Sequence, residues 1–559
     1  MHTPYNPTNT DTEGTWMKSW TISEKNHCDV LVIGSGAAGL RAAIEAARQG
    51  RNVLIACKSN GGRGTSTHIA NGGFRVAHED FTREEHFDLV MKGGRFINDR
   101  RKVRILAEEA PTAYEEMKQL GVTFRREGAM PSFQGGKALI QALEKEAVRL
   151  GVKTLNSTAI VELLRDGDRV CGAIAYDTGA GAFKALIAHA TILATGGAGA
   201  LYSFCDNPPH ATGDGYYLGL AAGAMLTGME FVQFYPLGAY QPERTALLFP
   251  PVLGNLGVIK NVDGEDIYQK HDITAWPAAS LARDTTSRAL YSEIDRGAGV
   301  GGALLLDLRK MTEEDWASSP GVQEKRPYLR RRFNCDEEPL PIIPVSHYTM
   351  GGIVINDWGE TGVEGLFAAG EATGGTHGAN RIGGNAIPEA LIFGMRAGQT
   401  ASHLSEKTSG RELPSESVIS DAVNRWRDTF SEALGERTEE ILDKVRGEVW
   451  EKVGIIREGT RLQSALESFD TLERDRLPRL PTSTPREVIA ALEARSLLLI
   501  ARMATNSALL REESRGAHYR SDFPEETEDG MFNTVVRLKG GKLEFEKIEV
   551  LAPRGAENE

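Results

Sequence analysis

The chain has 559 residues, of which 41% are hydrophobic and 25% are charged, with 77 acidic against 64 basic side chains and a net charge of -13. This composition is that of an ordinary globular protein of several domains, and it excludes the disordered, collagenous and membrane-spanning classes. The acidic balance disfavours nucleic acid and anionic lipid as partners. Because no run approaches the ~18 apolar residues of a transmembrane helix, we expect no membrane span.

The cysteines indicate a reducing compartment. The chain has five cysteines, an odd number, and they are widely spaced in the sequence: Cys28, Cys57, Cys171, Cys205 and Cys335. We therefore expect free thiols and a cytoplasmic location rather than a disulfide framework. No C-x-x-C run occurs, so neither a metal site nor an iron-sulfur cluster is expected in this chain, and electrons that travel through clusters need a partner protein.

The beginning of the chain predicts a strand, a tight turn and a helix. Residues 1–27 are polar, lack the apolar core of a signal peptide, and are expected to form a flexible extension. Asp29–Ile33 is a short β-branched run, and Ala-rich helical spacing continues through Arg48. A second strand is predicted at Asn52–Cys57, after the helix stop at Gln49-Gly50. This order begins a doubly wound α/β sheet.

The turn between the first strand and helix carries a glycine fingerprint, Gly34-x-Gly36-x-x-Gly39. The first glycine allows the turn, the second lets backbone approach a pyrophosphate, and the third lets the helix pack on the strand. A dinucleotide site is therefore predicted. The second strand ends in Cys57-Lys58-Ser59 rather than in the acidic residue that holds a ribose, which argues against a standard NAD site.

The middle of the chain leaves this domain and returns to it. Residues 75–150 are largely helical and charged, and Ala190–Gly197 is a buried strand that can rejoin the first sheet. From 241 to 345 the pattern is irregular, which indicates an inserted domain. Glycines are dense again from 351 to 394, as expected if the chain re-enters the first domain.

The C-terminal third is predicted to be helical and to end in a hairpin. Helical spacing runs from 414 to 512, and Thr484-Pro485-Arg486-Glu487 has a helix cap, an N1 proline and an N3 acid. Thr534–Leu538 and Leu543–Val550 alternate with period two around Gly540-Gly541. The predicted divisions are 1–27 (extension), 28–240 and 346–412 (two parts of the nucleotide-binding domain), 241–345 (capping domain), 413–512 (helical domain) and 513–559 (C-terminal segment).

Further motifs follow one another in a fixed order: Thr65–Gly73, Thr195–Gly197, Thr212–Gly215, Leu281–Arg288, His347–Ile353, Gly370-Glu371, His377–Asn385 and Glu513–Phe523. With the glycine fingerprint they make residues 28–525 similar to the flavoprotein subunits of fumarate reductase and succinate dehydrogenase, a family that includes L-aspartate oxidase. The resemblance implies an α/β fold with a Rossmann-like FAD-binding domain, an inserted capping domain, a C-terminal helical domain and a small C-terminal hairpin segment.

The resemblance implies FAD as cofactor. Many membrane-bound relatives attach FAD through a His at the position that is Ser66 here, so we predict non-covalent FAD; His68 is near but out of register. Backbone N–H groups from Arg381 to Ala386 are expected close to the isoalloxazine, where they stabilise a reduced flavin. The implied cofactor residues are Gly34, Ser35, Gly36, Ala38, Gly39, Lys58, Ser66, Thr67, Gly72, Gly73, Asp214, Glu371, Arg381, Ala386 and Ile387.

The catalytic residues that the resemblance implies are Arg283, His347 and Arg381. Arg283 matches the family's proton-donating Arg, while His347 and Arg381 match the pair that grips one substrate carboxylate. Arg288 is expected to be structural, and for Asp284 both a structural and a functional role stay open.

The second carboxylate is where the sequence departs from the family. Relatives acting on fumarate or succinate carry Phe-His-Pro-Thr-Gly and then Thr-Glu-Gly; here Tyr235 replaces the His, and Phe249-Pro250 replaces Thr-Glu. A wall of Phe249 and Pro250 rejects a free carboxylate, because desolvation without partners costs several kcal/mol. Either Tyr235, Tyr240 or Arg244 holds a dicarboxylate, or the substrate is an enoate with one carboxylate and an apolar or aromatic tail.

We therefore predict a FAD-dependent oxidoreductase subunit that interconverts a carboxylate-activated C=C bond and its saturated acid, of the fumarate/succinate type, with hydride at flavin N5 and a proton from Arg283. The alternatives are a reductase of a monocarboxylate enoate, L-aspartate oxidase, and a flavin electron-transfer subunit without chemistry of its own. The expected partners are a carboxylic acid and an iron-sulfur subunit. Any association with a membrane is expected to be peripheral, through partners.

Overall fold

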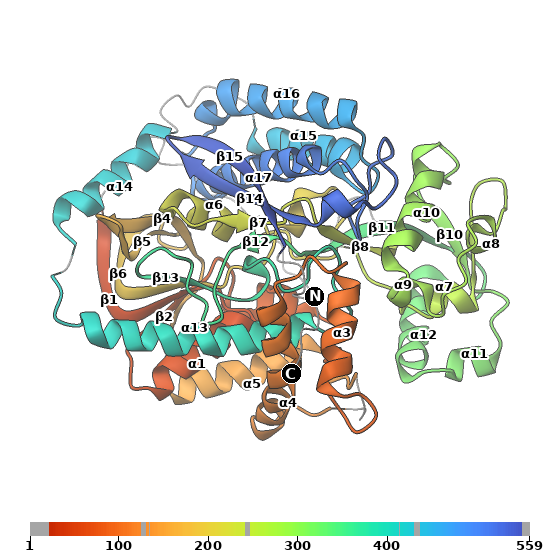
Figure 1. Ribbon diagram of the computed structural model, residues 1–559, viewed down its shortest axis with the longest axis horizontal. Helices are drawn as coiled ribbons and strands as arrows, with labels where there is room; N and C mark the ends of the chain where they lie inside the picture. The colour runs from red at the N-terminus through yellow and green to blue at the C-terminus, as the bar shows by residue number, and fades with distance from the viewer. Residues whose placement is uncertain are drawn as a thin grey trace, which may run out of the picture.

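The computed structural model describes residues 22–124, 130–133, 135–240, 246–412, 414–429 and 437–550. Within those residues a seven-stranded sheet has the order β3-β2-β1-β6-β5-β4, with β13 also beside β6 (Figure 1). Its strands are β1 (Ile22–Ile33), β2 (Val53–Ala56), β3 (Lys153–Leu155), β4 (Thr158–Asp166), β5 (Arg169–Asp177), β6 (Ala182–Leu193) and β13 (Leu366–Ala368). β1 pairs in parallel with both β2 and β6, so the predicted strands are confirmed and the one before Gly197 does rejoin the first sheet.

The first strand is longer than predicted. β1 begins at Ile22 and pairs with β6 from Ile22↔Phe183 onward, so residues 22–27 belong to the sheet and not to a flexible extension. Residues 1–21 lie outside the described residues. The polar stretch of β1 is mostly exposed, and an exposed strand has no buried face to reveal it in the sequence.

Helices cover the sheet, and two of them pack unusually closely. A Cβ on Gly394 of α13 would lie 2.5 Å from Ala38 O of α1, and one on Gly398 would lie 2.5 Å from Ala42 O. The glycines therefore set the spacing of the two helices, which run side by side below the sheet in Figure 1. The helices of this part are α1 (Ala37–Arg48), α2 (Ser66–Ile69), α3 (Arg83–Gly93), α4 (Arg100–Gln119), α5 (Gly136–Arg149), α6 (Asp214–Ala222) and α13 (Ala386–Thr408).

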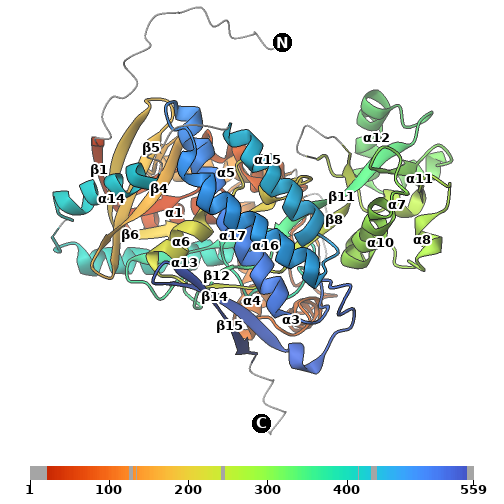
Figure 2. The ribbon, with the colours of Figure 1, turned by 90° about the horizontal axis from the view of Figure 1, so that it is seen from above.

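A smaller unit is inserted between β8 (Val232–Ala239) and β11 (Leu340–Thr349), and it projects to one side in Figure 2. Its sheet has the antiparallel order β8-β11-β10-β9, with β9 at Val258–Lys260 and β10 at Leu304–Asp307. Its helices are α7 (Leu253–Leu256), α8 (Ile267–Lys270), α9 (Ala278–Leu281), α10 (Arg283–Asp295), α11 (Glu313–Ala317) and α12 (Pro320–Phe333). β8 and β11 reach into the main body, so they connect this capping unit to it.

The C-terminal part is helical and then returns to the main body. Its helices are α14 (Glu416–Thr429), α15 (Thr438–Glu448), α16 (Gly459–Asp475) and α17 (Pro485–Leu510). The predicted start of α17 is confirmed: Thr484 Oγ1 accepts from Glu487 N at 3.3 Å, and Glu487 Oε2 accepts from Thr484 N at 2.9 Å. The predicted hairpin is confirmed as β14 (Phe532–Lys539) and β15 (Lys542–Glu549), and β14 pairs with β7 (Leu226–Thr227), which also pairs with β12 (Gly352–Ile353).

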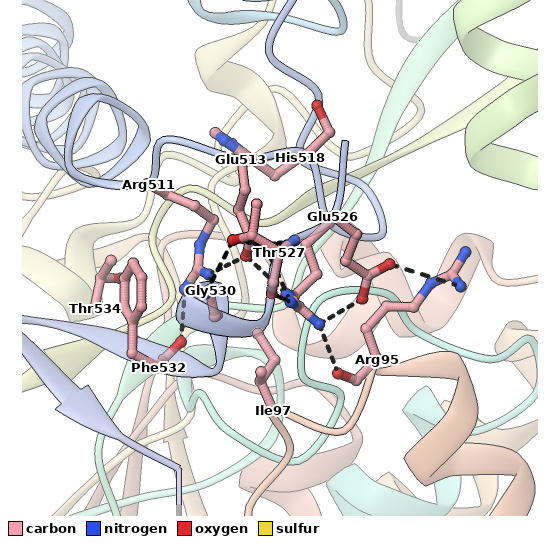
Figure 3. A network of polar contacts seen from close by, with 12 residues as sticks. Arg95, Ile97, Arg511, Glu513, His518, Glu526, Thr527, Gly530, Phe532 and Thr534 are labelled. Atoms are coloured by element: carbon pink, nitrogen blue, oxygen red, sulfur yellow. Dashed lines mark hydrogen bonds and ion pairs between the residues drawn. The ribbon is translucent and has the colours of Figure 1, made fainter. Parts of the chain in front are cut away.

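A buried network of charged side chains holds the segment after α17 against the main body (Figure 3). The Arg511 guanidinium donates to Glu230 Oε1 at 2.9 Å and to Glu513 Oε1 at 2.7 Å, and Arg515 Nε donates to Glu513 Oε1 at 2.7 Å. The side chains of Arg511, Glu230 and Glu513 are at most 1% exposed. Each charge has opposite charges beside it, as buried ions require.

Within the described residues no helix is long and apolar enough to cross a bilayer. The five cysteines are all free, as predicted, and only Cys205 is not fully buried.

Candidate active site

A cavity of 1330 Å³ runs from the glycine turn after β1 to the capping unit. The implied cofactor residues line it, except for Gly39. Gly39 faces inward instead, since a Cβ there would lie 2.1 Å from Gly34 O. It therefore serves the packing of helix on strand, the role predicted for the third glycine.

The glycine turn leaves backbone exposed to the cavity. Gly34 has a φ of 112°, and a Cβ there would lie 2.1 Å from Ala194 O, so only glycine fits. A Cβ on Gly36 would meet nothing closer than Thr67 Oγ1 at 3.5 Å, which leaves this glycine facing open space at the start of α1. Thr195 Oγ1 is buried beside the same cavity without a hydrogen-bond partner. A helix N-terminus, bare backbone and an unsatisfied hydroxyl suit a dinucleotide with a pyrophosphate.

Lys58 and Asp214 reach the cavity as predicted, but they are paired with each other. Lys58 Nζ lies 2.7 Å from Asp214 Oδ2 and 2.9 Å from Glu493 Oε1. Burial alone lowers the pKa of Lys58, but the two carboxylates overcome it and hold the pKa above its usual range. This lysine is therefore charged and already compensated, so it offers little net charge to a ligand.

The attachment point of covalent relatives has no nucleophilic nitrogen here. Ser66 lines the cavity, and its hydroxyl lies 3.4 Å from Asn207 Oδ1. His68, two positions further along α2, is not among the lining residues. This placement agrees with the prediction of non-covalent FAD, which stays a prediction.

The structure brings the three predicted catalytic residues together. Gln233 Oε1, on β8, accepts from Arg283 Nη1 at 2.7 Å and from Arg381 Nη2 at 3.0 Å. Arg283 begins α10 of the capping unit, whereas Arg381 lies in the glycine-rich loop before α13. One neutral amide thus joins two cations from different parts of the chain.

His347, on β11, has a carboxylate partner that sequence reasoning missed. Its Nδ1 lies 2.7 Å from Asp206 Oδ2, and Asn207 Nδ2 holds the other oxygen of Asp206 at 2.8 Å. Burial lowers the pKa of His347, Asp206 opposes this, and the two arginines reinforce the lowering. Gln233 was missed too, although it stands two positions before Tyr235 in the segment compared with the family.

The two arginines are cations without an acid of their own. Among the described residues neither forms an ion pair, and Arg381 Nε is buried with no hydrogen-bond partner. Burial, followed by repulsion from Arg381, lowers the pKa of Arg283 to about 10. By contrast Asp284 lies 3.6 Å from Arg288, which favours a structural role for both.

The region expected to face the second carboxylate differs from the prediction. Phe249 is 1% exposed, packs on Phe333 with ring centroids 5.6 Å apart, and does not line the cavity. Pro250 and Tyr240 do not line it either, whereas Leu248 and Pro251 do. The aromatic ring of Phe249 is drawn into the core of the capping unit, so it forms no wall of the substrate end.

Tyr235 does line the cavity, but its hydroxyl is engaged. It donates to Phe249 O at 2.7 Å, and its ring lies 5.2 Å from the Arg283 guanidinium and 5.7 Å from the His347 ring. Burial raises the pKa of this phenol above its ordinary value. Arg244, the other expected partner of a dicarboxylate, lies outside the described residues.

Comparisons with known proteins show which proteins the chain is similar to. Residues 29–387 match the FAD binding domain family and residues 443–552 match the fumarate reductase flavoprotein C-terminal family. The chain is 36% identical to a fumarate reductase (CoM/CoB) subunit of Methanothermobacter marburgensis, over 90% of this chain and 96% of that one. It is 30% identical to an L-aspartate oxidase of Nicotiana tabacum, over 91% and 83%. The solved structure of Mycobacterium smegmatis Sdh1 in complex with UQ1 superposes with a TM-score of 0.84 at 30% identity, over 95% of both chains.

Proposed function

The chain belongs to the family of fumarate reductase and succinate dehydrogenase flavoprotein subunits, which includes L-aspartate oxidase, and from this premise we propose that it interconverts an enoate and its saturated acid. It is an FAD-dependent oxidoreductase of the fumarate/succinate type. The observation that carries the proposal is the pair of uncompensated arginines with one His at the end of a dinucleotide cavity.

Bound FAD supplies hydride exchange at flavin N5. The residues implied to hold it line the cavity in five segments: Gly34 to Ala38 with Lys58, Ser66-Thr67, Gly72-Gly73, Asp214, and Glu371 with Arg381, Ala386 and Ile387. Glu371 Oε1 accepts from Thr349 N at 3.0 Å, and burial raises the pKa of Glu371 to about 7. This carboxyl group is therefore able to change protonation near neutral pH.

Arg381 and His347 bind one carboxylate of the substrate. Arg381 uses Nη2 for Gln233 and its Nε is buried, which leaves Nη1 to donate to a carboxylate oxygen. His347 lines the cavity and uses Nδ1 for Asp206, which leaves Nε2 to donate to the carboxylate when the ring is protonated. Drawing charge into this carboxylate activates the adjacent carbon.

Arg283 donates the proton to that carbon. Its Nε donates to Ala279 O at 3.3 Å and its Nη1 to Gln233, whereas Nη2 has no acceptor among the described residues. Because burial and Arg381 lower its pKa to about 10, this guanidinium is a better acid than an ordinary one. We assign the transferred proton to Nη2.

The test is to reduce the purified FAD-loaded protein and follow reoxidation of the flavin by fumarate, crotonate, cinnamate and oxygen. We expect reoxidation by at least one of the three enoates that is faster than by oxygen. Reoxidation by oxygen alone, with none by any enoate, would contradict the proposal.

L-aspartate oxidase is the second candidate, and the 30% identity to the tobacco enzyme favours it. Aspartate as the reductant separates the two functions: bleaching of the flavin by aspartate, with oxygen uptake on reoxidation, supports the oxidase. The absence of both supports the enoate reductase.

An electron-donating iron-sulfur subunit is part of the proposal. Among the described residues no cluster of three metal-ligating side chains occurs, and the Methanothermobacter relative is itself named as one subunit of an enzyme. A complex that co-purifies with iron and acid-labile sulfide would support this partner. Peripheral membrane association through that partner, in the cytoplasm, stays a prediction.

A further inference from the structure

Besides the catalytic trio and Lys58, three more cations line the cavity: Arg75, Lys325 and Arg332. Arg75 comes from the loop before α3, whereas Lys325 and Arg332 stand seven positions apart on α12 of the capping unit. None of the three has an ion pair among the described residues, in contrast with Lys58, which has two. The cavity therefore has cations beyond those that the proposed grip on one carboxylate uses.

Arg75 and the proposed proton donor Arg283 lie on either side of the same loop residue. Its Nε donates to Gly383 O at 3.0 Å, and a Cβ built on the same Gly383 would lie 3.7 Å from Arg283 Nη2. The two guanidinium groups thus flank one residue of the glycine-rich loop that also carries Arg381.

The outer edge of the Arg75 guanidinium has no strong acceptor. Its Nη2 lies 3.4 Å from Met130 Sδ, a weak acceptor, and its Cζ lies 5.8 Å from the centre of the Phe81 ring. Burial is the cause that lowers the pKa of Arg75, and no carboxylate offsets it. An anion that enters the cavity stabilises a half-buried cation such as Arg75. An apolar substrate group at the position of that anion would instead desolvate the cation further.

We propose that Arg75 is a specificity-determining residue that binds a second carboxylate of the substrate. The inference rests on the proposed function and names its substrate class, an enoate with two carboxylates. It also explains how the site works without a Thr-Glu pair: the second anionic group is held from the loop after Gly72-Gly73 rather than from the segment at Phe249-Pro250. Lys325 lines the same cavity from the capping unit.

Binding is tested first, because it needs no turnover. The oxidised FAD-loaded protein is titrated with malonate, a dicarboxylate without the CH–CH bond to be oxidised, and with propionate, while the flavin absorption is recorded. We expect R75Q to raise the dissociation constant of malonate about 10- to 100-fold and that of propionate less than threefold, as for a lost charge-assisted hydrogen bond. An equal change for both acids, or none for malonate, overturns the inference.

Turnover is tested with fumarate and crotonate, which differ by one carboxylate. We expect R75Q to raise KM for fumarate by a similar factor, with kcat within about threefold, because an anion held equally in ground and transition state affects binding only. KM for crotonate stays within threefold. If the wild type is reoxidised by none of fumarate, crotonate and cinnamate, the proposed function fails, and the malonate titration still decides whether Arg75 binds an anion.

Two variants complete the design. R75K keeps the charge but loses the planar fork, and we expect a three- to tenfold weaker malonate site; it also gives the test if R75Q does not retain FAD. R100Q is the matched control, because Arg100 also lies over an aromatic ring, at 5.2 Å from Phe87, but does not line the cavity. An effect of R100Q as large as that of R75Q overturns the assignment.

Discussion

Buried and half-buried arginines have opposite surroundings in two regions of this protein. In the C-terminal network, Arg511 contacts two carboxylates: Glu230 at 2.9 Å, and Glu513 at 2.7 Å, which Figure 3 labels beside it. At the substrate end, Arg283 and Arg381 share one neutral oxygen of Gln233.

The difference separates charges that hold the fold from charges that await a ligand. A buried ion costs several kcal/mol unless opposite charges and hydrogen bonds surround it. The network meets this cost within the chain, so its arginines are structural. At the substrate end no carboxylate offsets the desolvation cost of the two arginines. An anion that enters there is therefore bound by charges that the fold has not paired.

The largest expected effect is on catalysis at the uncompensated end. Arg283→Ala should lower kcat about 10³- to 10⁴-fold, since it removes the proposed proton donor. The melting temperature should stay the same or rise, because a half-buried cation without an acid partner is lost, and the flavin spectrum should be unchanged. Arg288→Ala, on the same helix but 3.6 Å from Asp284, is the control and should retain activity. Unchanged turnover in Arg283→Ala would favour a flavin electron-transfer subunit.

In the C-terminal network, where carboxylates pair with the arginines, a substitution should lower stability and leave catalysis unchanged. Glu513→Gln leaves two buried guanidinium groups short of a charge, and we expect a loss of about 3 to 5 kcal/mol in the free energy of unfolding. Urea unfolding followed by circular dichroism measures it, while kcat per bound flavin should stay close to wild type. Glu526→Gln is the control, since Glu526 contacts Arg515 in the same network but is 40% exposed. Similar losses in both variants would show that burial is not what matters.

The sequence predicts local features of this molecule well. The glycine turn, the cap at Thr484 and the hairpin turn at Gly540-Gly541 depend on neighbours in the chain, and the structure has each of them. The predicted fold class is confirmed by the solved relatives, which superpose over 95% of the chain.

Contacts between residues far apart in the chain could not be predicted from the sequence. Asp206 reaches His347 across 141 positions, and Gln233 reaches Arg381 across 148, so no local pattern indicates either contact. Phe249 was expected at the substrate, yet whether an aromatic ring turns toward a cavity or into a core depends on the space beside Phe333. Arg75 gave no signal, because only the tertiary structure shows that it has no acid beside it.

The same comparison applies to a buried acid, the carboxyl group of Glu389. Glu389 on α13 is buried, its Oε2 has no hydrogen-bond partner, and burial raises its pKa to about 8. The unfolded chain loses this proton near pH 4.5 and the folded chain near pH 8, so the unfolded state binds fewer protons between them and stability falls as pH rises through this window.

Glu389→Gln should remove that decline. We expect the free energy of unfolding to fall roughly 2 to 4 kcal/mol less between pH 5 and pH 8 than in the wild type, as measured by urea unfolding at several pH values. Glu406→Gln, at the exposed end of the same helix, should leave the wild-type slope. A slope that is the same in all three proteins would mean that Glu389 is ionised in the folded state.

The smallest expected effect concerns the Asp206 carboxylate beside His347. This carboxylate lies at the substrate end, where the arginines have no acid partner, but it is itself paired with a histidine. Asp206→Asn keeps the shape but loses the charge, and we expect kcat/KM to fall about tenfold, or ~1.4 kcal/mol. Burial and both arginines lower the pKa of His347 and only Asp206 opposes them, so in the variant the imidazole loses its proton at a lower pH. The pH above which substrate affinity declines should therefore shift downward, as a pH profile of KM records, whereas Asp284→Asn should leave it in place. A profile that does not move would mean that His347 binds the substrate as a neutral ring, and only the arginines would then supply charge at this end of the cavity.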